Sequence, residues 1–266
     1  MECDLRKIEG INRHETEYLY KEIFLRESYL RHGVSLPADA IVFDVGANIG
    51  MFSLFVGLKC PRASLFSFEP VPPIFDKLKK NIGTLSIPAN LFQFGLSDVE
   101  GEASFVYYPG YSTLSVQETY ADTPAEKKFI KRQALNEQRR NGTLDPTASS
   151  DLDELLEYRL QEVRYSCQLR PLSDVIEQYS LTRIDLLKVD VQRAELNVLH
   201  GIREPHWPII QQIAMEVHNE PGAVANGQLR QLTTDLEGRG FAVITDQDEF
   251  LSGSDRYNLV ARRGAR

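Results

Sequence analysis

The sequence has few cysteines, and their spacing suggests no pairing. Cys3, Cys60 and Cys167 are the only three in 266 residues. An odd number at such wide intervals matches neither a disulfide framework nor the short repeated spacing of a zinc site. We therefore expect a reducing, cytoplasmic environment and no metal site.

The chain also lacks a long apolar run and an excess of basic charge. No stretch approaches the ~18 consecutive apolar residues of a membrane span, and no apolar secretory region follows residues 1–4. The formal net charge is −8, which argues against general binding of nucleic acid, because phosphates require a basic surface. We expect neither a membrane nor a nucleic acid as partner.

What the chain does contain is enough apolar sequence for one large α/β domain, since 42% of its residues are hydrophobic. Its organising stretch is 41–50, Ile-Val-Phe-Asp-Val-Gly-Ala-Asn-Ile-Gly. The pattern predicts a buried strand at 41–45, a tight turn at Gly46 and Gly50, and a helix from Met51. Strand, glycine turn and helix form the ligand-binding start of a doubly wound α/β sheet.

Alternation of strands and helices continues along the chain. Apolar runs predict strands at 63–68 and 90–94 with a helix at 72–81 between them, which gives a right-handed parallel unit. Further strands are expected at 103–108, 165–169, 184–190, 209–217, 241–244 and 257–261. The run 165–169 is a candidate partner of 103–108.

Two segments surround this scaffold. Residues 14–30 have apolar side chains at helical spacing, and Asn12 with Glu15 fits a capping box at the start of that helix. The helix either covers a sheet edge or forms a lid over the site. Residues 121–163 are charged, and we interpret them as two helices inserted in the scaffold. The apolar runs on either side of this insertion are expected to complete one sheet.

Polar residues follow the predicted strands, at the carboxyl ends where such sheets bind ligands. They are Asp44 and Gly46, Glu69, Ser97 and Asp98, Asp190, and His218. Glu69 stands 25 residues after Asp44, about one strand–helix–strand step on, where an acid accepts both hydroxyls of a ribose.

The glycine turn itself has the pattern Asp-x-Gly-x-Asn-x-Gly over residues 44–50. It differs from the Gly-x-Gly-x-x-Gly turn that holds a pyrophosphate. An acid at the turn suits the positive sulfonium and amino groups of S-adenosylmethionine and repels a pyrophosphate. A nicotinamide oxidoreductase is therefore disfavoured. The remaining alternative is a chance glycine-rich turn in an α/β core.

These motifs resemble the FkbM family of S-adenosylmethionine-dependent methyltransferases. The resemblance rests on residues 44–50, Phe68-Glu69-Pro70, Gly95-Leu96-Ser97-Asp98 and Lys188-Val189-Asp190-Val191. It implies a Rossmann-like class I methyltransferase fold with a seven-stranded, mostly parallel sheet and an antiparallel last strand. The whole chain, 1–266, would be one domain: a helical lid at 1–38, a core at 39–110 and 169–266, and an insertion at 111–168.

The resemblance also implies the cofactor, S-adenosyl-L-methionine, and the product S-adenosyl-L-homocysteine. The residues implied to bind the cofactor are Asp44, Gly46, Ala47, Asn48, Gly50, Glu69, Pro70, Ser97 and Asp190. One position departs from the family, because an acid is common where this chain has Gln192. We expect Glu195 to lie too far along the helix to replace that acid.

Both ends of the chain resemble O-methyltransferase domains of polyketide and peptide synthetases, at 12–39, at Glu216-Val217-His218 and at Tyr257-Asn258-Leu259. This implies methylation of a hydroxyl, the β-hydroxyl in our interpretation, on an acyl chain tethered to an acyl carrier protein, with flanking synthase domains as further partners. Basic residues of the insertion would suit an acidic carrier. The same segment is otherwise a cover over the acceptor channel or two solvated helices.

An aliphatic hydroxyl is a weak nucleophile, so a general base is expected. We assign His218 as that base, with Glu216 beside it and Asp190 as an acid of the cofactor and acceptor site. The alternatives for His218 are a structural histidine or a metal ligand, and for Asp190 a helix cap.

Two further functions stay open: a free-standing methyltransferase of a sugar or lipid hydroxyl, and a cofactor-binding domain that has lost its chemistry.

Overall fold

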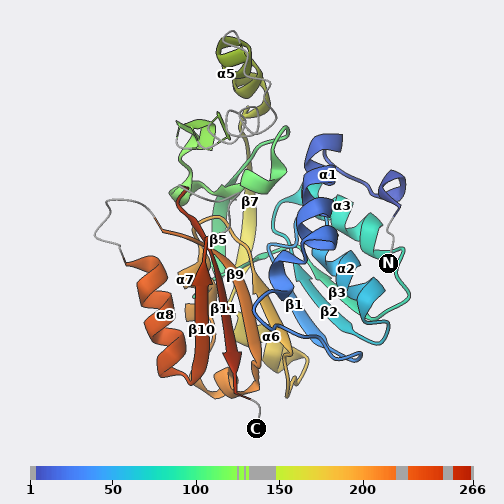
Figure 1. Cartoon of the computed structure of the whole chain (residues 1–266), viewed down its shortest axis with the longest axis vertical. Helices are drawn as coiled ribbons and strands as arrows, with labels where there is room; N and C mark the ends of the chain where they lie inside the picture. Colours follow the sequence, from blue (N-terminus) through green and yellow to red (C-terminus); the bar gives the residue numbers. More distant parts are fainter. Residues whose placement is uncertain are drawn as a thin grey trace.

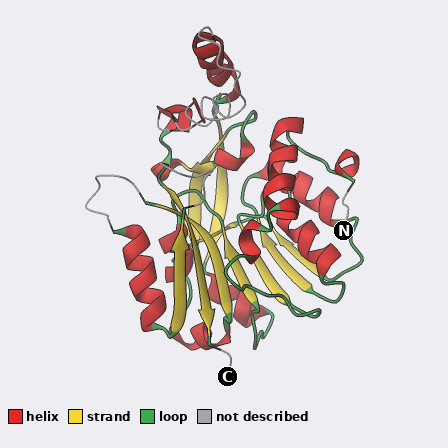
Figure 2. Ribbon diagram, viewed as in Figure 1, coloured by secondary structure: helices red, strands yellow, loops and turns green. Residues whose placement is uncertain are grey.

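The computed structural model describes residues 4–124, 126–128, 130–131, 148–219, 227–247 and 254–264. Its main element is a seven-stranded sheet in the order β10-β11-β9-β8-β1-β2-β3 (Figures 1 and 2). The strands are β1 (Ile41–Val45), β2 (Ser64–Phe68), β3 (Ala89–Phe92), β8 (Leu186–Val189), β9 (Gln212–His218), β10 (Phe241–Asp246) and β11 (Arg256–Arg263). Each begins and ends within three residues of its predicted range.

The sheet is parallel except at its last strand. β1 pairs in parallel with β2 and β8, and β8 pairs in parallel with β9. β11 runs antiparallel to both β9 and β10. The class I, Rossmann-like methyltransferase fold with an antiparallel last strand is thus confirmed. The parallel strands β9, β8, β1 and β2 direct their carboxyl ends to one edge of the sheet. Ligands bind at that edge in such sheets.

Both faces of the sheet are covered. Side chains alternate along a strand, so Val42 and Phe43 enter different apolar clusters. Val42 packs with α2 and α3, while Phe43 packs with α6, α7 and α8. These helices are α2 (Met51–Lys59), α3 (Pro72–Ile82), α6 (Leu172–Gln178), α7 (Glu195–His200) and α8 (Gln228–Gly238).

The leader is helical over a shorter range than predicted. The helix α1 (Arg13–Tyr20) continues as a π-helix over Lys21–Leu25. The chain then turns at Glu27, whose φ is 46°. A single helix to residue 30 is therefore wrong. Asn12 caps α1 as expected, because its Oδ1 accepts from the Glu15 amide at 2.9 Å.

A second sheet lies beside the first, in the order β4-β7-β5-β6. Its strands are β4 (Gly95–Leu96), β5 (Gly101–Tyr107), β6 (Val116–Gln117) and β7 (Val163–Arg170). The antiparallel pairing of β5 with β7 confirms the predicted pairing of those segments. The expectation that the apolar runs before and after the insertion complete one sheet is confirmed, because β1, β2 and β3 join β8, β9, β10 and β11 in the seven-stranded sheet. The segments that directly flank the insertion, β5 and β7, form this second sheet in addition.

The insertion carries α5 (Ala148–Arg159), which projects away from the two sheets (Figure 1). Lys127 pairs with Glu157 at 2.5 Å, and Lys131 pairs with Asp153 at 2.7 Å. The basic residues of the insertion that we expected to suit a carrier protein are Lys127, Lys128, Lys131 and Arg132, and two of them are thus paired inside the chain. Arg132 lies outside the described residues.

Among the residues that the structure describes, no helix combines the length and the apolar character needed to cross a membrane.

Candidate active site

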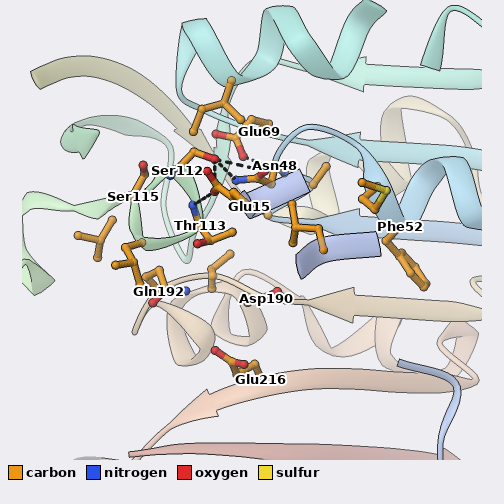
Figure 3. A pocket seen from close by; sticks show the side chains of 18 of the residues that line it. Glu15, Asn48, Phe52, Glu69, Ser112, Thr113, Ser115, Asp190, Gln192 and Glu216 are labelled. Carbon is orange, nitrogen blue, oxygen red and sulfur yellow. Dashed lines mark hydrogen bonds between the residues drawn. The ribbon is translucent and has the colours of Figure 1, made fainter. Parts of the chain in front are cut away.

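A cavity of about 590 Å³ opens at the carboxyl ends of β1, β2, β8 and β9. The leader helix and the segment 111–117 form its other walls. Figure 3 shows side chains from these distant parts of the chain directed into one space. A cavity of this size is typical of small-molecule and cofactor sites.

The turn after β1 forms the floor. The amides of Gly46 and Ala47 donate to the Phe68 carbonyl at 3.1 and 2.9 Å, which fixes the turn against the end of β2. Gly46 has a φ of +72°, and a Cβ there would lie 1.9 Å from the Asp190 carbonyl oxygen. Only glycine permits this approach of backbone to backbone.

Glu69 lies beside this turn at the end of β2 and is 6% exposed. Its two carboxylate oxygens accept from the amides of Asn48, at 3.1 Å, and Val71, at 3.0 Å. Burial raises the pKa of Glu69 to about 7, although these two hydrogen bonds oppose the rise. Each oxygen has accepted one donor and can accept another, so the carboxylate can hold both hydroxyls of a ribose.

The leader contributes an acid that the sequence analysis assigned only to a cap. The Glu15 carboxylate accepts from the Ser112 hydroxyl at 2.6 Å and from the Thr113 amide at 2.7 Å. Asn48 donates to the same Ser112 hydroxyl at 3.2 Å, and Figure 3 shows these four side chains together. Burial raises the pKa of Glu15. The pattern Asn-x-x-Glu was the available signal: the carboxylate accepts from the Asn12 side-chain amide at 3.2 Å, as well as from the segment across the pocket.

A second leader contact reaches the end of β8. The Tyr29 hydroxyl donates to Asp190 Oδ2 at 2.5 Å, and burial together with Asp190 raises the pKa of Tyr29. The buried Ile23 of the leader belongs to the apolar cluster that contains α2. Leader residues such as Glu15 and Tyr29 line the pocket, which favours the lid of the two alternatives for this segment.

Glu216, on β9, faces the pocket near Asp190 (Figure 3). Burial and the charge of Asp190 raise the pKa of Glu216 to about 7, although Arg256 and His218 lower it. The Nε of Arg256 lies 3.3 Å from Glu216 Oε1. A carboxylate with a pKa near neutrality is suited to general base catalysis.

A family comparison decides the class of protein. The family model described as the methyltransferase FkbM domain matches residues 44–243. The chain belongs to the FkbM methyltransferase family. It is an S-adenosylmethionine-dependent methyltransferase.

Three relatives of this FkbM-family chain show how widely the domain is used. It is 43% identical to the AMB antimetabolite synthetase AmbE of Pseudomonas aeruginosa, over 99% of this chain but only 12% of AmbE. It is 35% identical to the 31-O-demethyl-FK506 methyltransferase FkbM of Streptomyces tacrolimicus, over 96% of this chain and 93% of that protein. It is 32% identical to the methyltransferase sdnD of Sordaria araneosa, over 99% and 95%.

The pocket residues fit the cofactor of the FkbM family. The close backbone approach at Gly46 leaves a floor without a side chain, and the Glu69 oxygens are available to a ribose. Asp190 and Glu216 give the pocket wall two carboxyl groups, which suit a positively charged sulfonium. When bound, the cofactor supplies an activated methyl group. Of the predicted cofactor residues, the pocket brings together Gly46, Ala47, Asn48, Glu69, Pro70 and Asp190.

The predicted base, His218, does not face the pocket. It is 1% exposed, and both ring nitrogens are engaged: Nδ1 lies 2.7 Å from Glu195 Oε1, and Nε2 accepts from Arg256 Nε at 3.1 Å. Burial opposes protonation, but Glu195 outweighs it and raises the pKa of His218. The assignment of His218 as the base is therefore wrong in this geometry, because an acceptor hydroxyl cannot reach either nitrogen.

Asp44 also lies outside the pocket lining. It is fully buried, accepts from the Ser53 hydroxyl at 2.6 Å, and forms an ion pair with Lys188 at 3.0 Å. Strand alternation explains the error, since Asp44 shares the face of Val42 and points beneath α2. The prediction that its charge faces the sulfonium is therefore wrong.

Gly50 and Ser97 are the other predicted cofactor residues that the pocket lining lacks. Gly50 has a φ of +85° at the start of α2, where a Cβ would contact Leu78 at 2.7 Å. The Ser97 hydroxyl is buried and donates to Asp98. Both shape the turns that surround the pocket.

Gln192 lines the pocket, and its Oε1 accepts from Arg256 Nη2 at 3.3 Å. Glu195 is fully buried and contacts His218 and Gln228 instead, as its position along the helix predicted. Within the described ranges, no group of three histidine, cysteine or acidic side chains is placed to hold a metal ion.

Proposed function

We propose that the chain transfers the methyl group of S-adenosylmethionine to a hydroxyl, the β-hydroxyl in the leading version, of a polyketide or peptide intermediate bound to an acyl carrier protein. The match to AmbE supports this most strongly. The whole chain aligns with a segment that is 12% of a synthetase, which is the arrangement of a domain that acts among flanking synthase domains on a tethered intermediate.

The residues take separate tasks in this proposal. Glu69 would bind the ribose, and the turn at Gly46 would give the cofactor a close backbone floor. Glu216 takes the proton of the acceptor hydroxyl, and the carboxylate of Asp190 would favour the positive charge of the sulfonium. Alignment of donor and acceptor provides much of the rate, and a positioned base adds about 10²–10⁴-fold.

The test is mass spectrometry of hydroxyacyl carrier proteins incubated with the protein and S-adenosylmethionine. We expect a gain of one methyl group on a hydroxyacyl carrier and none on the matching carrier that lacks the hydroxyl. Binding of S-adenosylhomocysteine without methyl transfer to any hydroxyacyl carrier would reject the proposal and favour a cofactor-binding domain without chemistry.

A free-standing O-methyltransferase of a sugar or lipid hydroxyl is the second candidate. It is favoured by the matches to FkbM and sdnD, which span 93% and 95% of those proteins. The two candidate functions are distinguished by comparing the carrier-bound hydroxyacyl group with the same group on a small free thioester. Equal kcat/KM for the free and the carrier-bound acceptor would favour the free-standing enzyme.

A further inference from the structure

A buried guanidinium links the pocket to the insertion. Arg256, on β11, is 4% exposed and has polar neighbours both in the pocket wall and behind it. Its Nε lies 3.3 Å from Glu216 and donates to His218. Its Nη2 donates to Glu126 Oε2 at 2.9 Å and to Gln192 Oε1 at 3.3 Å.

Glu126 is the member of this cluster that comes from the insertion. It is 6% exposed, whereas its neighbour in sequence, Lys127, pairs with an exposed glutamate, Glu157. The second Glu126 oxygen lies 3.6 Å from Arg193 Nη2. Burying a carboxylate is costly unless it is paired, and the partners of Glu126 are these two arginines behind the pocket wall.

We propose that Glu126 is a positioning residue of the methyltransferase site, which acts on Glu216 through Arg256. Two carboxylates share one guanidinium, Glu216 on its Nε and Glu126 on its Nη2. The negative charge of Glu126 partly offsets the positive charge of Arg256. Arg256 therefore stabilises the ionised form of Glu216 less, and Glu216 keeps the proton affinity that a base requires. The inference rests on the role proposed for Glu216 and adds the insertion to the machinery that sets it.

The titratable groups that act electrostatically on Glu216 come from several elements. They include Tyr18 and Tyr29 of the leader, Asp190 after β8, Glu195 on α7, His218 on β9 and Arg256 on β11. Substitution of Glu126 changes none of these residues. A change in the titration of Glu216 in a Glu126 variant therefore reports on the loss of the Glu126 charge beside Arg256.

The experiment is a carbon-13 NMR titration of the ligand-free protein labelled at glutamate carboxyls, with the Glu216 signal assigned from Glu216→Gln. In Glu126→Gln the amide still accepts from Arg256 but carries no charge, so we expect the Glu216 midpoint to fall by about one pH unit. Adding Gln192→Glu returns a carboxylate to the same Nη2 and should restore the midpoint. The control is Glu157→Gln, an exposed glutamate of the same insertion, which should leave the midpoint unchanged.

An unchanged midpoint in Glu126→Gln, or a shift that the double variant does not reverse, would overturn the proposal. If Glu126→Gln does not fold, the double variant decides, because Arg256 keeps a carboxylate partner there. A folded double variant with the wild-type midpoint supports the proposal, and an unfolded or shifted one rejects it. The titration uses no methyl acceptor, so failure of the proposed function in the carrier assay would remain a separate result.

Discussion

Asp44 and Glu69 end neighbouring strands, but their carboxylates have different partners. Lys188 forms an ion pair with Asp44 beneath the turn, whereas the hydrogen bonds of Glu69 come from backbone amides. A buried acid with only neutral donors keeps a raised pKa and spare acceptor capacity. At the scale of single residues, this difference in partners makes Glu69 a ligand-binding group and Asp44 a structural one.

The raised pKa of Glu69 has a measurable effect on stability. Burial moves it from 4.5 to about 7, so the contribution of Glu69 to stability is present below pH 4.5 and is lost as the pH rises through about 7. We therefore expect Glu69→Gln to gain stability relative to the wild type over this range, by on the order of 1–3 kcal/mol. Urea unfolding of the ligand-free proteins at about pH 5 and about pH 8 measures this change.

Glu157→Gln, which alters an exposed carboxylate, is the control and should show the same pH dependence as the wild type. A stability difference between Glu69→Gln and the wild type that is the same at both pH values would contradict the raised pKa.

At the scale of elements, the leader helix α1 acts on the pocket through one carboxylate. Glu15 accepts from the amides of Ser112 and Thr113, at 3.3 and 2.7 Å. In Glu15→Ala these amides lose their acceptor, so we expect their hydrogen exchange to accelerate about tenfold. Exchange measured by mass spectrometry over 111–115 tests this.

The matched control is Glu17→Ala, which removes an exposed ion pair with Arg13 on the same helix. Unaltered exchange at 111–115 in Glu15→Ala would show that α1 does not hold that segment.

The sequence predicted those elements whose signals are local. The strand and turn at 41–50 and the strand at 64–68 follow from apolar runs and glycine positions that neighbouring residues define. β4 and β6 have only two residues each and exist because β5 and β7 pair across more than fifty residues. The pairing of β5 with β7 was predicted from their two apolar runs, but a strand of two residues has no local pattern of its own.

The site residues, like the elements, divide into those that local sequence signals predict and those that depend on distant contacts. Gly46 and Glu69 were predictable because a turn and a strand end place them, whatever the rest of the chain does. The target of Glu15 and the burial of His218 depend on contacts with residues 97 and 23 positions away. Tertiary structure alone decides those contacts.

At the scale of the whole molecule, charge opposes an acidic carrier. The net charge is −8, and Lys127 and Lys131 of the insertion are already paired with acids. Salt screens long-range repulsion. We therefore expect KM for a carrier-bound acceptor to fall about two- to fivefold when ionic strength rises from about 0.01 to about 0.15 M, while KM for the free thioester stays constant. A rise in KM would instead indicate docking on exposed basic residues such as Lys128.

The assignment of Glu216 as the base is tested most directly by single-turnover methyl transfer in Glu216→Gln with the cofactor bound. We predict a rate about 10²–10⁴-fold below the wild type, with unchanged affinity for S-adenosylhomocysteine. Transfer at the wild-type rate in Glu216→Gln would contradict the assignment and return the search for the base to the other acids of the pocket.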